Sequence, residues 1–304
     1  MILSCGEALI DMLPRTTPGG EQAFAPYAGG AVFNTAIALG RLGVPAGFFS
    51  GLSSDLFGDV LRSTLEASRV DASPAHVSAR PTTLAFVRLT DGHASYTFYD
   101  ENTAGRMLTP DDLPDVKAEA LFFGGISLVG EPCGTAYEAL QERECAGRVT
   151  MIDPNIRPSF VTDEAAYRGR IERMCARADI VKLSDEDLRW LGGQGTTDDL
   201  AAALLRKGAK LVLITEGARG ATGYAEGRRV SVEARRVEVV DTVGAGDTFN
   251  AGVLAQLYRT GALTKDRVAA LSEDEIAAAL SLGAAAAAIT VSRAGANPPW
   301  EGEL

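Results

Sequence analysis

The sequence predicts an α/β fold in which a doubly wound, mostly parallel β-sheet is flanked by helices. Two observations support this prediction. Short apolar runs, as in buried parallel strands, alternate with segments of helical periodicity along most of the chain. Polar side chains directly follow several of these runs, where the carboxyl ends of parallel strands would form a ligand site.

Each expected element follows from its local pattern of apolar residues and from the helix or turn signals at its ends. The expected strands are 1–11, 46–50, 120–123, 149–152, 180–183, 211–215 and 237–240. The expected helices are 33–42, 55–67, 135–145, 164–177, 198–206 and 249–258. We expect 276–291 to be a buried helix that runs into a strand.

The alternation of strands and helices breaks at Pro81. Residues 82–99 read instead as a β-hairpin with a turn at 90–93. We expect this hairpin to project from the main sheet as a small β-sheet lid, and an antiparallel edge of the main sheet is the alternative. A second short hairpin is expected at 224–232.

The composition is that of a soluble globular protein, because 46% of the 304 residues are hydrophobic and 23% are charged. No linker or internal repeat divides the chain. We therefore expect a single domain, 1–304, with a lid insertion at approximately 12–28 and 82–104.

Charge and cysteine content argue against several partners. The formal net charge of −11, with no basic run, argues against nucleic acid. Four widely spaced cysteines and two histidines argue against a structural zinc site and favour reduced thiols. The N-terminus has no positive signal-peptide segment, and 276–291 is shorter than the roughly 20 residues of a membrane-spanning helix. We expect a cytoplasmic protein with no membrane partner.

The stretch 241–249, Asp-Thr-Val-Gly-Ala-Gly-Asp-Thr-Phe, joins an expected strand to an expected helix. Gly244 and Gly246 allow close approach of a ligand, and the free amides of the first helical turn attract an anion such as phosphate. Asp247 would repel that phosphate, so we expect its carboxylate to face a hydroxyl proton. The pattern indicates phosphoryl transfer to an alcohol, although an ordinary capped helix start has the same spacing.

Other polar groups also follow expected strands. They are Asp11, the stretch 153–157, Lys182, Ser184 and Thr215. Each alone has a structural explanation, such as a capped, acid-rich helix start at 184–187 or a surface ion pair of Arg157. Their recurrence after strands of one α/β chain favours a shared site at one edge of the sheet.

Two glycine stretches resemble the signatures of one family. The stretch 29–34, Gly-Gly-Ala-Val-Phe-Asn, resembles the N-terminal signature of the ribokinase-like (PfkB) carbohydrate kinases, and 241–249 resembles the C-terminal one. The stretches 153–157, 214–220 and 291–298 match in order, so the resemblance spans nearly the whole chain. It implies a ribokinase-like fold and transfer of the γ-phosphoryl group of ATP to a sugar.

The resemblance also implies roles for single residues. Asp247 would be the catalytic base, and the amides of Gly244, Ala245 and Gly246 would form an anion hole for the transferring group. Arg157 matches a residue near the phosphate and the sugar. The positions that match the sugar side are Asp11, Gly29, Gly30 and Asn34, with Phe98 or Tyr99 covering the sugar. The positions that match the nucleotide side are Lys182, Ser184, Thr215, Gly217 and Gly220, with Gly283 and Ala284 near the adenine.

Two departures from the family pattern concern metal ions. The family often has Asn-x-x-Glu where this chain has Ser184-x-x-Asp187, and the shorter acid would organise Mg²⁺ through water. Many members bind K⁺ near the last signature, where Asp241 and Val243 occupy the matching positions. Pro299 stands where a serine can help to bind that ion.

The acceptor is expected to be a neutral sugar. Kinases of this family for 2-keto-3-deoxygluconate carry Arg after an aromatic pair, whereas Asp100 and Glu101 follow Phe98 and Tyr99 here and would repel a carboxylate. The stretches 6–11 and 29–34 resemble those of bacterial fructokinases, which favours conversion of fructose to fructose 6-phosphate.

Other functions remain as alternatives. They are 2-keto-3-deoxygluconate kinase, another sugar or nucleoside kinase of the family, and a sensor that binds without turnover. The presence of Asp247 between its glycines argues against a sensor, and a dehydrogenase would need G-x-G-x-x-G after the first strand. The apolar residues Leu84, Phe86 and Tyr96 on the lid sheet favour a homodimer.

Overall fold

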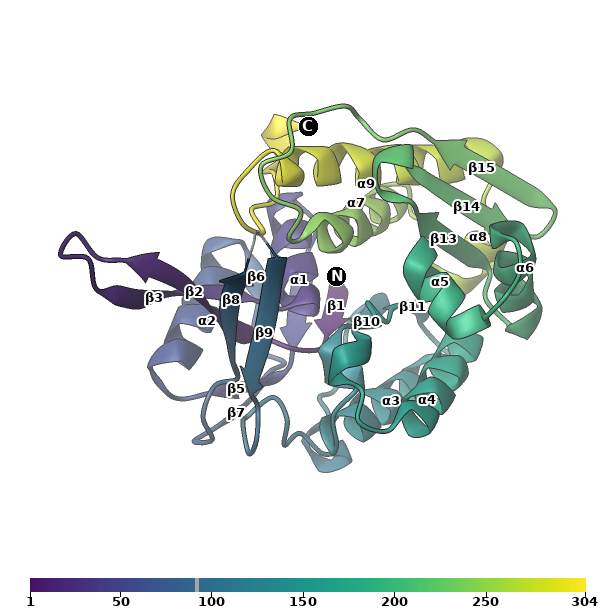
Figure 1. Cartoon of the computed structure of the whole chain (residues 1–304). Coiled ribbons are helices and arrows are strands. Elements are labelled where there is room, and N and C mark those ends of the chain that lie inside the picture. Colours follow the sequence, from purple (N-terminus) through teal and green to yellow (C-terminus); the bar gives the residue numbers. More distant parts are fainter. Residues whose placement is uncertain (91–92) are drawn as a thin grey trace.

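The computed structural model describes residues 1–90 and 93–304 (Figure 1). The strands of its main sheet are β1 (Ile2–Cys5), β4 (Ala46–Phe49), β6 (Val70–Asp71), β10 (Ala120–Gly124), β11 (Val149–Asp153), β12 (Ile180–Ser184), β13 (Leu211–Thr215), β14 (Ala221–Ala225) and β15 (Arg228–Val232). Their order is β15-β14-β13-β12-β11-β10-β1-β4-β6. Pairing is parallel from β6 to β13 and antiparallel for β14 and β15, which agrees with the predicted mostly parallel sheet.

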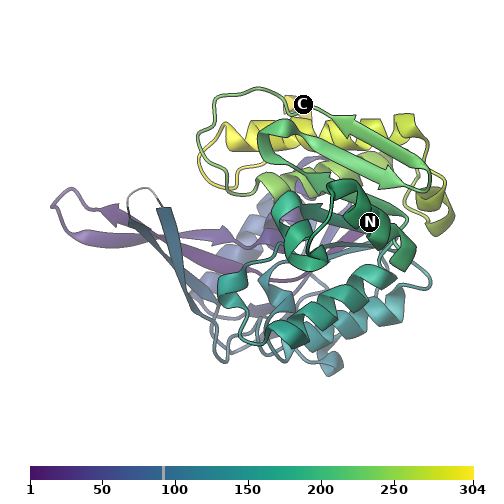
Figure 2. The same ribbon diagram turned by 45° about the vertical axis from the view of Figure 1, so that its right-hand side comes forward.

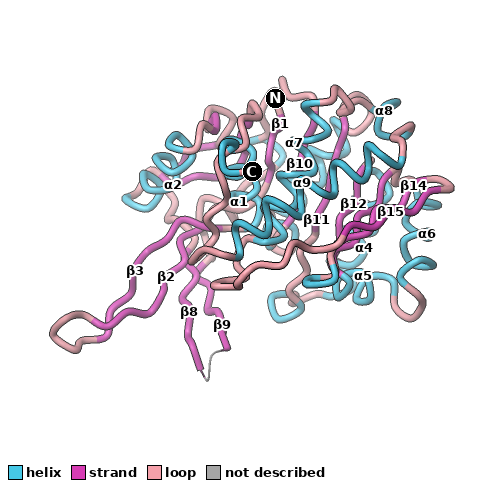
Figure 3. Tube along the Cα trace, turned by 90° about the horizontal axis from the view of Figure 1, so that it is seen from above, coloured by secondary structure: helices cyan, strands magenta, loops and turns pink. Residues whose placement is uncertain are grey.

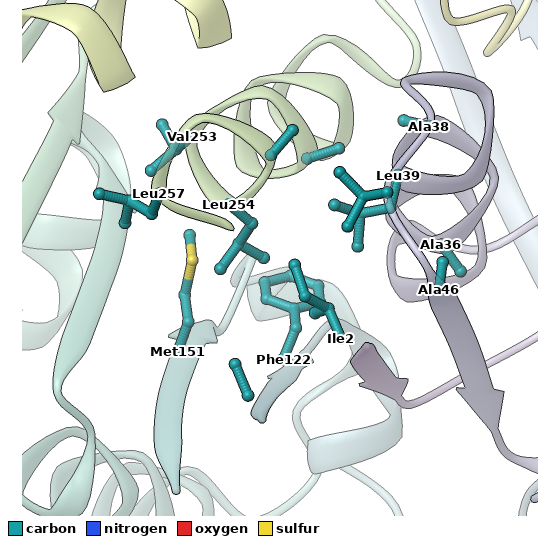
Figure 4. Packing of buried hydrophobic residues seen from close by; sticks show 14 of the residues in the cluster. Ile2, Ala36, Ala38, Leu39, Ala46, Phe122, Met151, Val253, Leu254 and Leu257 are labelled. Carbon is teal, nitrogen blue, oxygen red and sulfur yellow. The ribbon is translucent and has the colours of Figure 1, made fainter. Parts of the chain in front are cut away.

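Helices cover both faces of this sheet (Figures 1 and 2). They are α1 (Ala31–Arg41), α2 (Leu56–Ala67), α3 (Cys133–Glu144), α4 (Glu164–Arg177), α5 (Asp185–Gly192), α6 (Thr197–Lys207), α7 (Ala245–Arg259), α8 (Lys265–Ala269) and α9 (Glu273–Val291). Because strand residues alternate between faces, Ile2 belongs to the core cluster that includes residues of α1, α2, α7, α8 and α9, whereas Leu3 belongs to the cluster that includes residues of α3, α4, α5 and α6. In Figure 4, Leu254 and Leu257 of α7 lie over Phe122 and Met151 of the sheet.

The order of the strands in the main sheet indicates where a ligand would bind. The chain leaves β1 for β4 on one side of it, and β10 returns on the other side. In open α/β sheets, ligands bind at the carboxyl ends of the strands where the strand order reverses in this way. The carboxyl ends of β1 and β10 are therefore the expected location of the site.

The hairpin at 82–99 belongs to a separate small sheet. Its strands are β2 (Leu9–Thr16), β3 (Gln22–Gly29), β8 (Leu84–Thr90) and β9 (His93–Tyr99), in the order β3-β2-β8-β9. This sheet extends away from the helices of the main body (Figure 3), so the hairpin is no antiparallel edge of the main sheet. The predicted turn at 90–93 lies partly outside the described residues. Two further strands, β5 (Gly51–Ser53) and β7 (His76–Ser78), pair with each other.

The predicted strand at 237–240 is wrong. Val239 and Val240 are 60% and 59% exposed, and the main sheet has already ended at β15. The alternating valines resemble a strand, but they lie beyond the last strand of the sheet and have no strand neighbour in the described chain. The N–H of Val240 instead donates to the carbonyl of Val291, 2.8 Å away.

The prediction that Asp11 ends the first strand is also wrong. The strand β1 stops at Cys5, and Asp11 lies inside β2 of the small sheet. Gly6 follows β1 at a close approach to α1, since a Cβ there would lie 2.4 Å from Cγ2 of Val32. The chain therefore leaves the main sheet at this glycine and starts a second strand.

The C-terminal apolar run is helical throughout, and the predicted change to a strand does not occur. The helix α9 is long and apolar enough to span a membrane by length and composition, with a mean hydropathy of 1.5 and 44% of that window buried. Its contact with α7 accounts for this composition. A Cβ on Gly252 would lie 2.7 Å from Cα of Gly283, so the two helices approach closely.

Candidate active site

The first turns of α1 and α7 meet at the crevice. Nδ2 of Asn34 in α1 donates a hydrogen bond of 2.9 Å to Oδ2 of Asp247 in α7. Oγ1 of Thr35 donates to the backbone carbonyl of Asp247, 3.2 Å away. Asn34 and Asp247 are only 8% and 7% exposed. The two glycine signatures, far apart in the sequence, are thus joined by their polar residues.

Burial raises the pKa of Asp247 to about 7. The hydrogen bond from Asn34 opposes this rise in pKa, the nearby charge of Asp153 adds to it, and Lys182 opposes it. A carboxyl group with a pKa near 7 can accept and return a proton at neutral pH. Asp247 therefore has the property that a general base at this site needs.

The start of α7 is open to an anion. Gly244, the residue before the helix, has the left-handed φ of 78° and provides no side-chain cap. A Cβ on Gly244 would lie 2.7 Å from Cβ of Ala296, so both the backbone angle and the space favour glycine. The amides of Ala245 and Gly246 lie in this first turn without a side-chain cap, although the N–H of Ala245 donates a long hydrogen bond of 3.4 Å to the carbonyl of Thr242. The helix dipole favours negative charge there.

A buried ion pair lies beside this turn. Nζ of Lys182 donates to Oδ2 of Asp153 at 2.8 Å, and Nδ2 of Asn250 donates to the same oxygen at 2.7 Å. A Cβ on Gly246 would be 3.2 Å from Nζ of Lys182, so the ammonium adjoins the open end of α7. The sequence prediction included Asp153 only within the stretch 153–157 that follows a strand, and it gave this carboxylate no role of its own.

Ser184 and Asp187 form the capping box of α5, which is the structural alternative that the sequence left open. Oγ of Ser184 accepts the N–H of Asp187, and Oδ1 of Asp187 accepts the N–H of Ile156 at 3.1 Å. Burial raises the pKa of Asp187, and the charge of Asp153 adds to that effect. Within the described ranges there is no group of three or more His, Cys, Asp or Glu residues that could hold a metal ion.

Arg157 is exposed at the start of a 3-10 turn, Pro158–Phe160. Its Nη1 donates to the carbonyls of Asn155 and Ile156 in its own loop, at 3.4 and 3.0 Å. Among the residues that the structure describes, its guanidinium makes no ion pair. Its predicted position near the transferring phosphate stays a prediction.

The four predicted sugar-side residues are brought together. Asp11 lies on β2 beside the end of β3, where a Cβ on Gly29 would be only 2.4 Å from its Oδ2. Gly30 has a φ of 113° and leads directly into α1, whose first turn contains Asn34. Burial raises the pKa of Asp11 to about 6. The glycine pair therefore leaves room for the carboxylate of Asp11 at the end of β3, directly before the turn that carries Asn34.

Phe98 and Tyr99 lie on opposite faces of the small sheet. Asp11 pairs with Ala85, and Ala85 pairs with Phe98, so Phe98 shares the face of Asp11. The ring of Phe98 packs edge-on against Phe160, with centroids 4.5 Å apart. Tyr99 is 61% exposed on the other face. The sequence predicted that either Phe98 or Tyr99 covers the sugar. The register of the sheet favours Phe98 for this contact.

The predicted nucleotide-side residues lie at the ends of β12 and β13 and on α9. Thr215 ends β13, and the turn from Gly217 to Gly220 leads into β14. Gly220 has a φ of 102°, and a Cβ there would lie 2.0 Å from the carbonyl oxygen of Val232. Tight packing alone therefore explains Gly220.

Close packing also explains the glycine predicted to lie near the adenine. A Cβ on Gly283 would be 2.9 Å from the ring of Phe249. Ala284 is half-buried on the same helix. The contacts of Gly283 and Ala284 with a nucleotide stay predictions.

Asp241 connects the two loops around the start of α7. Its Oδ1 accepts the N–H of Val243 at 3.0 Å, and its Oδ2 accepts the N–H of Gly295 at 2.9 Å. Both carboxylate oxygens are thus used to hold backbone, which leaves the surrounding backbone carbonyls as candidate ligands for a monovalent cation.

Asp100 is paired with a cation, contrary to the expectation that its charge repels an acidic sugar. Nη1 of Arg106 forms an ion pair with Oδ2 of Asp100 at 2.5 Å. The pair has no net charge, so only Glu101 is left to repel an acidic sugar. The sequence argument missed Arg106 because it lies outside the hairpin and nothing in the sequence pairs it with Asp100.

Comparison with known proteins identifies the family. Residues 1–302 match the pfkB family carbohydrate kinases. The chain belongs to this family. The chain is 60% identical over 278 residues to a fructokinase of Rhizobium leguminosarum bv. trifolii, and the match covers 91% of this chain and 85% of the relative. The resemblance indicated by the two glycine signatures is thereby confirmed.

Solved structures with the same ribokinase-like fold include kinases for two kinds of acceptor. Fructokinase with bound ATP from Xylella fastidiosa is 31% identical with a TM-score of 0.88, covering 97% of this chain and 93% of the other. A double mutant of fructokinase from Vibrio cholerae O395, with fructose, ADP and potassium ion bound, is 27% identical (TM-score 0.85; 97% and 93% covered). Aminoimidazole riboside kinase from Salmonella enterica, complexed with aminoimidazole riboside and an ATP analog, is 28% identical (TM-score 0.84; 97% and 94% covered). The fold prediction is confirmed.

The raised pKa of Asp247 makes a prediction about stability. The folded state binds this proton more tightly than the unfolded state, so folding loses stability as pH rises from about 4 to about 7. Asp247→Asn removes that loss. Urea unfolding should show the variant more stable than the wild type, with an advantage that grows by roughly 2–3 kcal/mol between pH 5 and pH 8.

Asp55→Asn is the matched control. Asp55 caps α2 and accepts hydrogen bonds from Gly58 and Thr82, which lower its pKa against the opposing effect of burial. Its stabilisation is complete above its unfolded pKa and is lost only at lower pH, so Asp55→Asn should lower stability equally at pH 5 and pH 8. An advantage of Asp247→Asn that did not change between these pH values would contradict the raised pKa.

Proposed function

We propose that the protein is an ATP-dependent fructokinase that converts fructose to fructose 6-phosphate. One observation carries the proposal for this chain: the buried carboxylate of Asp247 is held by Asn34 beside the uncapped start of α7. This arrangement places a proton acceptor next to an anion site. The 60% identical fructokinase of Rhizobium supports fructose as the acceptor.

In the proposed reaction, Asp247 takes the proton from the C6 hydroxyl as its oxygen bonds to the γ-phosphorus of ATP. The bond from that phosphorus to the bridging oxygen breaks, and ADP leaves. The amides of Gly244, Ala245 and Gly246 stabilise the charge on the transferring group, because they face an anion without a competing side-chain cap. Lys182 adds a positive charge beside the same turn.

The small sheet acts as a lid over the sugar in this proposal. Asp11, Gly29, Gly30 and Asn34 hold sugar hydroxyls at its base. Phe98 covers the sugar, since it shares the sheet face of Asp11. The lid comprises approximately 12–28 and 82–104, inserted into one domain.

The nucleotide lies along the carboxyl ends of β12 and β13 in this proposal, at Ser184, Thr215, Gly217 and Gly220, with Gly283 and Ala284 near the adenine. Arg157 contacts the sugar and the transferring phosphate in this proposal.

Metal ions complete the proposed site. Mg²⁺ is held mainly by ATP phosphates and water, because the described residues offer no cluster of protein ligands. Asp187 contributes at most through water, since its oxygens accept backbone amides. K⁺ binds to backbone carbonyls of the loop at Asp241 and Val243, which is consistent with the potassium ion in the Vibrio fructokinase.

The acceptor is tested by measuring ADP release with ATP and each of five compounds: fructose, ribose, adenosine, aminoimidazole riboside and 2-keto-3-deoxygluconate. Fructose should give the highest kcat/KM. Because a site built for sugar hydroxyls leaves its polar groups unpaired with a poorly matched acceptor, we expect the others to be at least 10-fold lower. A higher value for 2-keto-3-deoxygluconate would refute the neutral-sugar assignment, and one for aminoimidazole riboside would reassign the enzyme.

We further propose a homodimer formed through the outer face of the small sheet, and a cytoplasmic location. Phe24 and Tyr99 each pack edge-to-face against Phe86 on the face opposite Asp11, with centroid distances of 5.0 and 5.5 Å. Phe24 and Tyr99 are 47% and 61% exposed, and such apolar patches mark interaction surfaces. Leu84 lies on the same face, whereas the side chain of Tyr96 is outside the described ones. All four cysteines are free, as in a reducing compartment.

The dimer is tested by light scattering of the wild type, the double variant Phe24→Asp/Tyr99→Asp, and Val239→Asp. Val239 is 60% exposed in the loop after β15, so it matches Tyr99 in exposure but lies outside the small sheet. The wild type and Val239→Asp should have the mass of a dimer, and the double variant that of a monomer. A monomeric wild type would refute the proposal.

A further inference from the structure

The start of α1 is closed by a carboxylate from a distant part of the chain. Gly30 precedes α1 and provides no side-chain cap. Oε1 of Glu7 accepts the N–H of Ala31 at 2.8 Å and that of Val32 at 3.4 Å. Its Oε2 accepts the N–H of Ser127, 3.3 Å away. Glu7 therefore connects the exit of β1, the first turn of α1 and the loop after β10.

Two glycines leave the space that Glu7 occupies. A Cβ on Gly125 would lie 2.1 Å from Oε1 of Glu7, and one on Gly30 would lie 2.9 Å from its carbonyl oxygen. Any side chain at Gly125 would therefore displace the carboxylate. The fit comes from two separate segments of the chain, which indicates that this carboxylate has a defined position.

No cation neutralises Glu7 in the part of the chain that the structure describes. Glu7 is only 9% exposed, and an adjoining cavity of about 40 Å³ is lined by Asp100, Arg106, Tyr137 and Cys133 among others. Arg106 is paired with Asp100. A buried carboxylate that has neutral donors but no cation is costly for stability, and such groups are enriched at functional sites.

The first turn of α1 connects Glu7 to the reacting groups. The N–H of Asn34 donates to the carbonyl of Gly30 at 2.8 Å, which closes the turn whose amides Glu7 accepts. The side chain of Asn34 then donates to Asp247. We propose that Glu7 is a positioning residue for phosphoryl transfer, which fixes the first turn of α1 so that Asn34 holds Asp247 against the sugar hydroxyl.

This role rests on the proposed kinase function. It gives the first turns of α1 and α7 different tasks in the site. The amides at the start of α1 are occupied by Glu7, so α1 offers no anion site. The start of α7 has no side-chain cap and can receive a phosphoryl group. In this proposal α1, whose first amides bind Glu7, orients the base Asp247 and the sugar hydroxyl that accepts the phosphoryl group.

The test compares Glu7→Gln with Glu144→Gln. Glu144 is 8% exposed and forms ion pairs with Arg143 and Arg148. The control therefore makes the same substitution at a glutamate of similar burial. Glu144 is the last residue of α3 and lies at the end of that helix away from the crevice. In Glu7→Gln the new NH₂ group would meet the N–H of Ser127, donor against donor, and the first turn would shift. We expect kcat/KM for fructose to fall about 10- to 100-fold, with little change in KM for ATP. Glu144→Gln should keep wild-type kinetics.

A double-mutant cycle separates positioning from a general structural role. If Glu7 acts through Asn34, Glu7→Gln should cost little further activity in an Asn34→Ala background. Equal losses in both backgrounds, or unchanged kinetics of Glu7→Gln, would overturn the inference. A wild type inactive on every sugar would instead refute the proposed function.

Folding of the variants is followed by thermal melting. If Glu7→Gln does not fold, the same cycle is run with Glu7→Asp, which keeps the charge but withdraws it by one methylene. Coupling to Asn34 in that variant supports positioning. Failure of both variants to fold would overturn it, because the carboxylate would then be a requirement of the fold itself.

Discussion

The hydrogen bond from Asn34 to Asp247 is the contact on which the site depends. It is possible only because α1 and α7, from opposite ends of the chain, begin at the same point beside the carboxyl ends of β1 and β10. The close approach of α7 to α9 at Gly252 and Gly283 holds one partner. The amide contacts of Glu7 hold the other. The sheet, the helix packing and the chemistry therefore meet at a single pair of side chains.

The carboxylates near this contact differ in the groups that donate hydrogen bonds to them. Asp153 accepts from a lysine ammonium and an asparagine amide, whereas Glu7 and Asp187 accept backbone N–H groups, at the start of α1 and in the loop at Ile156. Asp247 accepts from one neutral side-chain donor, Asn34, and burial raises its pKa to about 7. The carboxyl group of Asp247 is therefore able to exchange a proton at neutral pH.

Local periodicity predicted most helices and parallel strands, because buried strands and amphipathic helices differ in their repeat. The prediction from periodicity failed where contacts with residues distant in the sequence determine the secondary structure. The valines at 237–240 alternate but have no strand to pair with, and 276–291 remains helical because it packs along α7. Asp247 and Asn34 were found through glycine signatures. Glu7 and Arg106 were missed, since their partners lie far away or are backbone amides, which no spacing reveals.

The central claim is that Asp247 acts as the proton acceptor and contributes little to nucleotide affinity. The most direct measurement is of Asp247→Ala, with calorimetric binding of ATP and turnover of fructose determined on the same preparation. The account predicts nearly unchanged ATP affinity and turnover reduced by at least about 10²- to 10⁴-fold, as for loss of a general base. Turnover close to that of the wild type would contradict it.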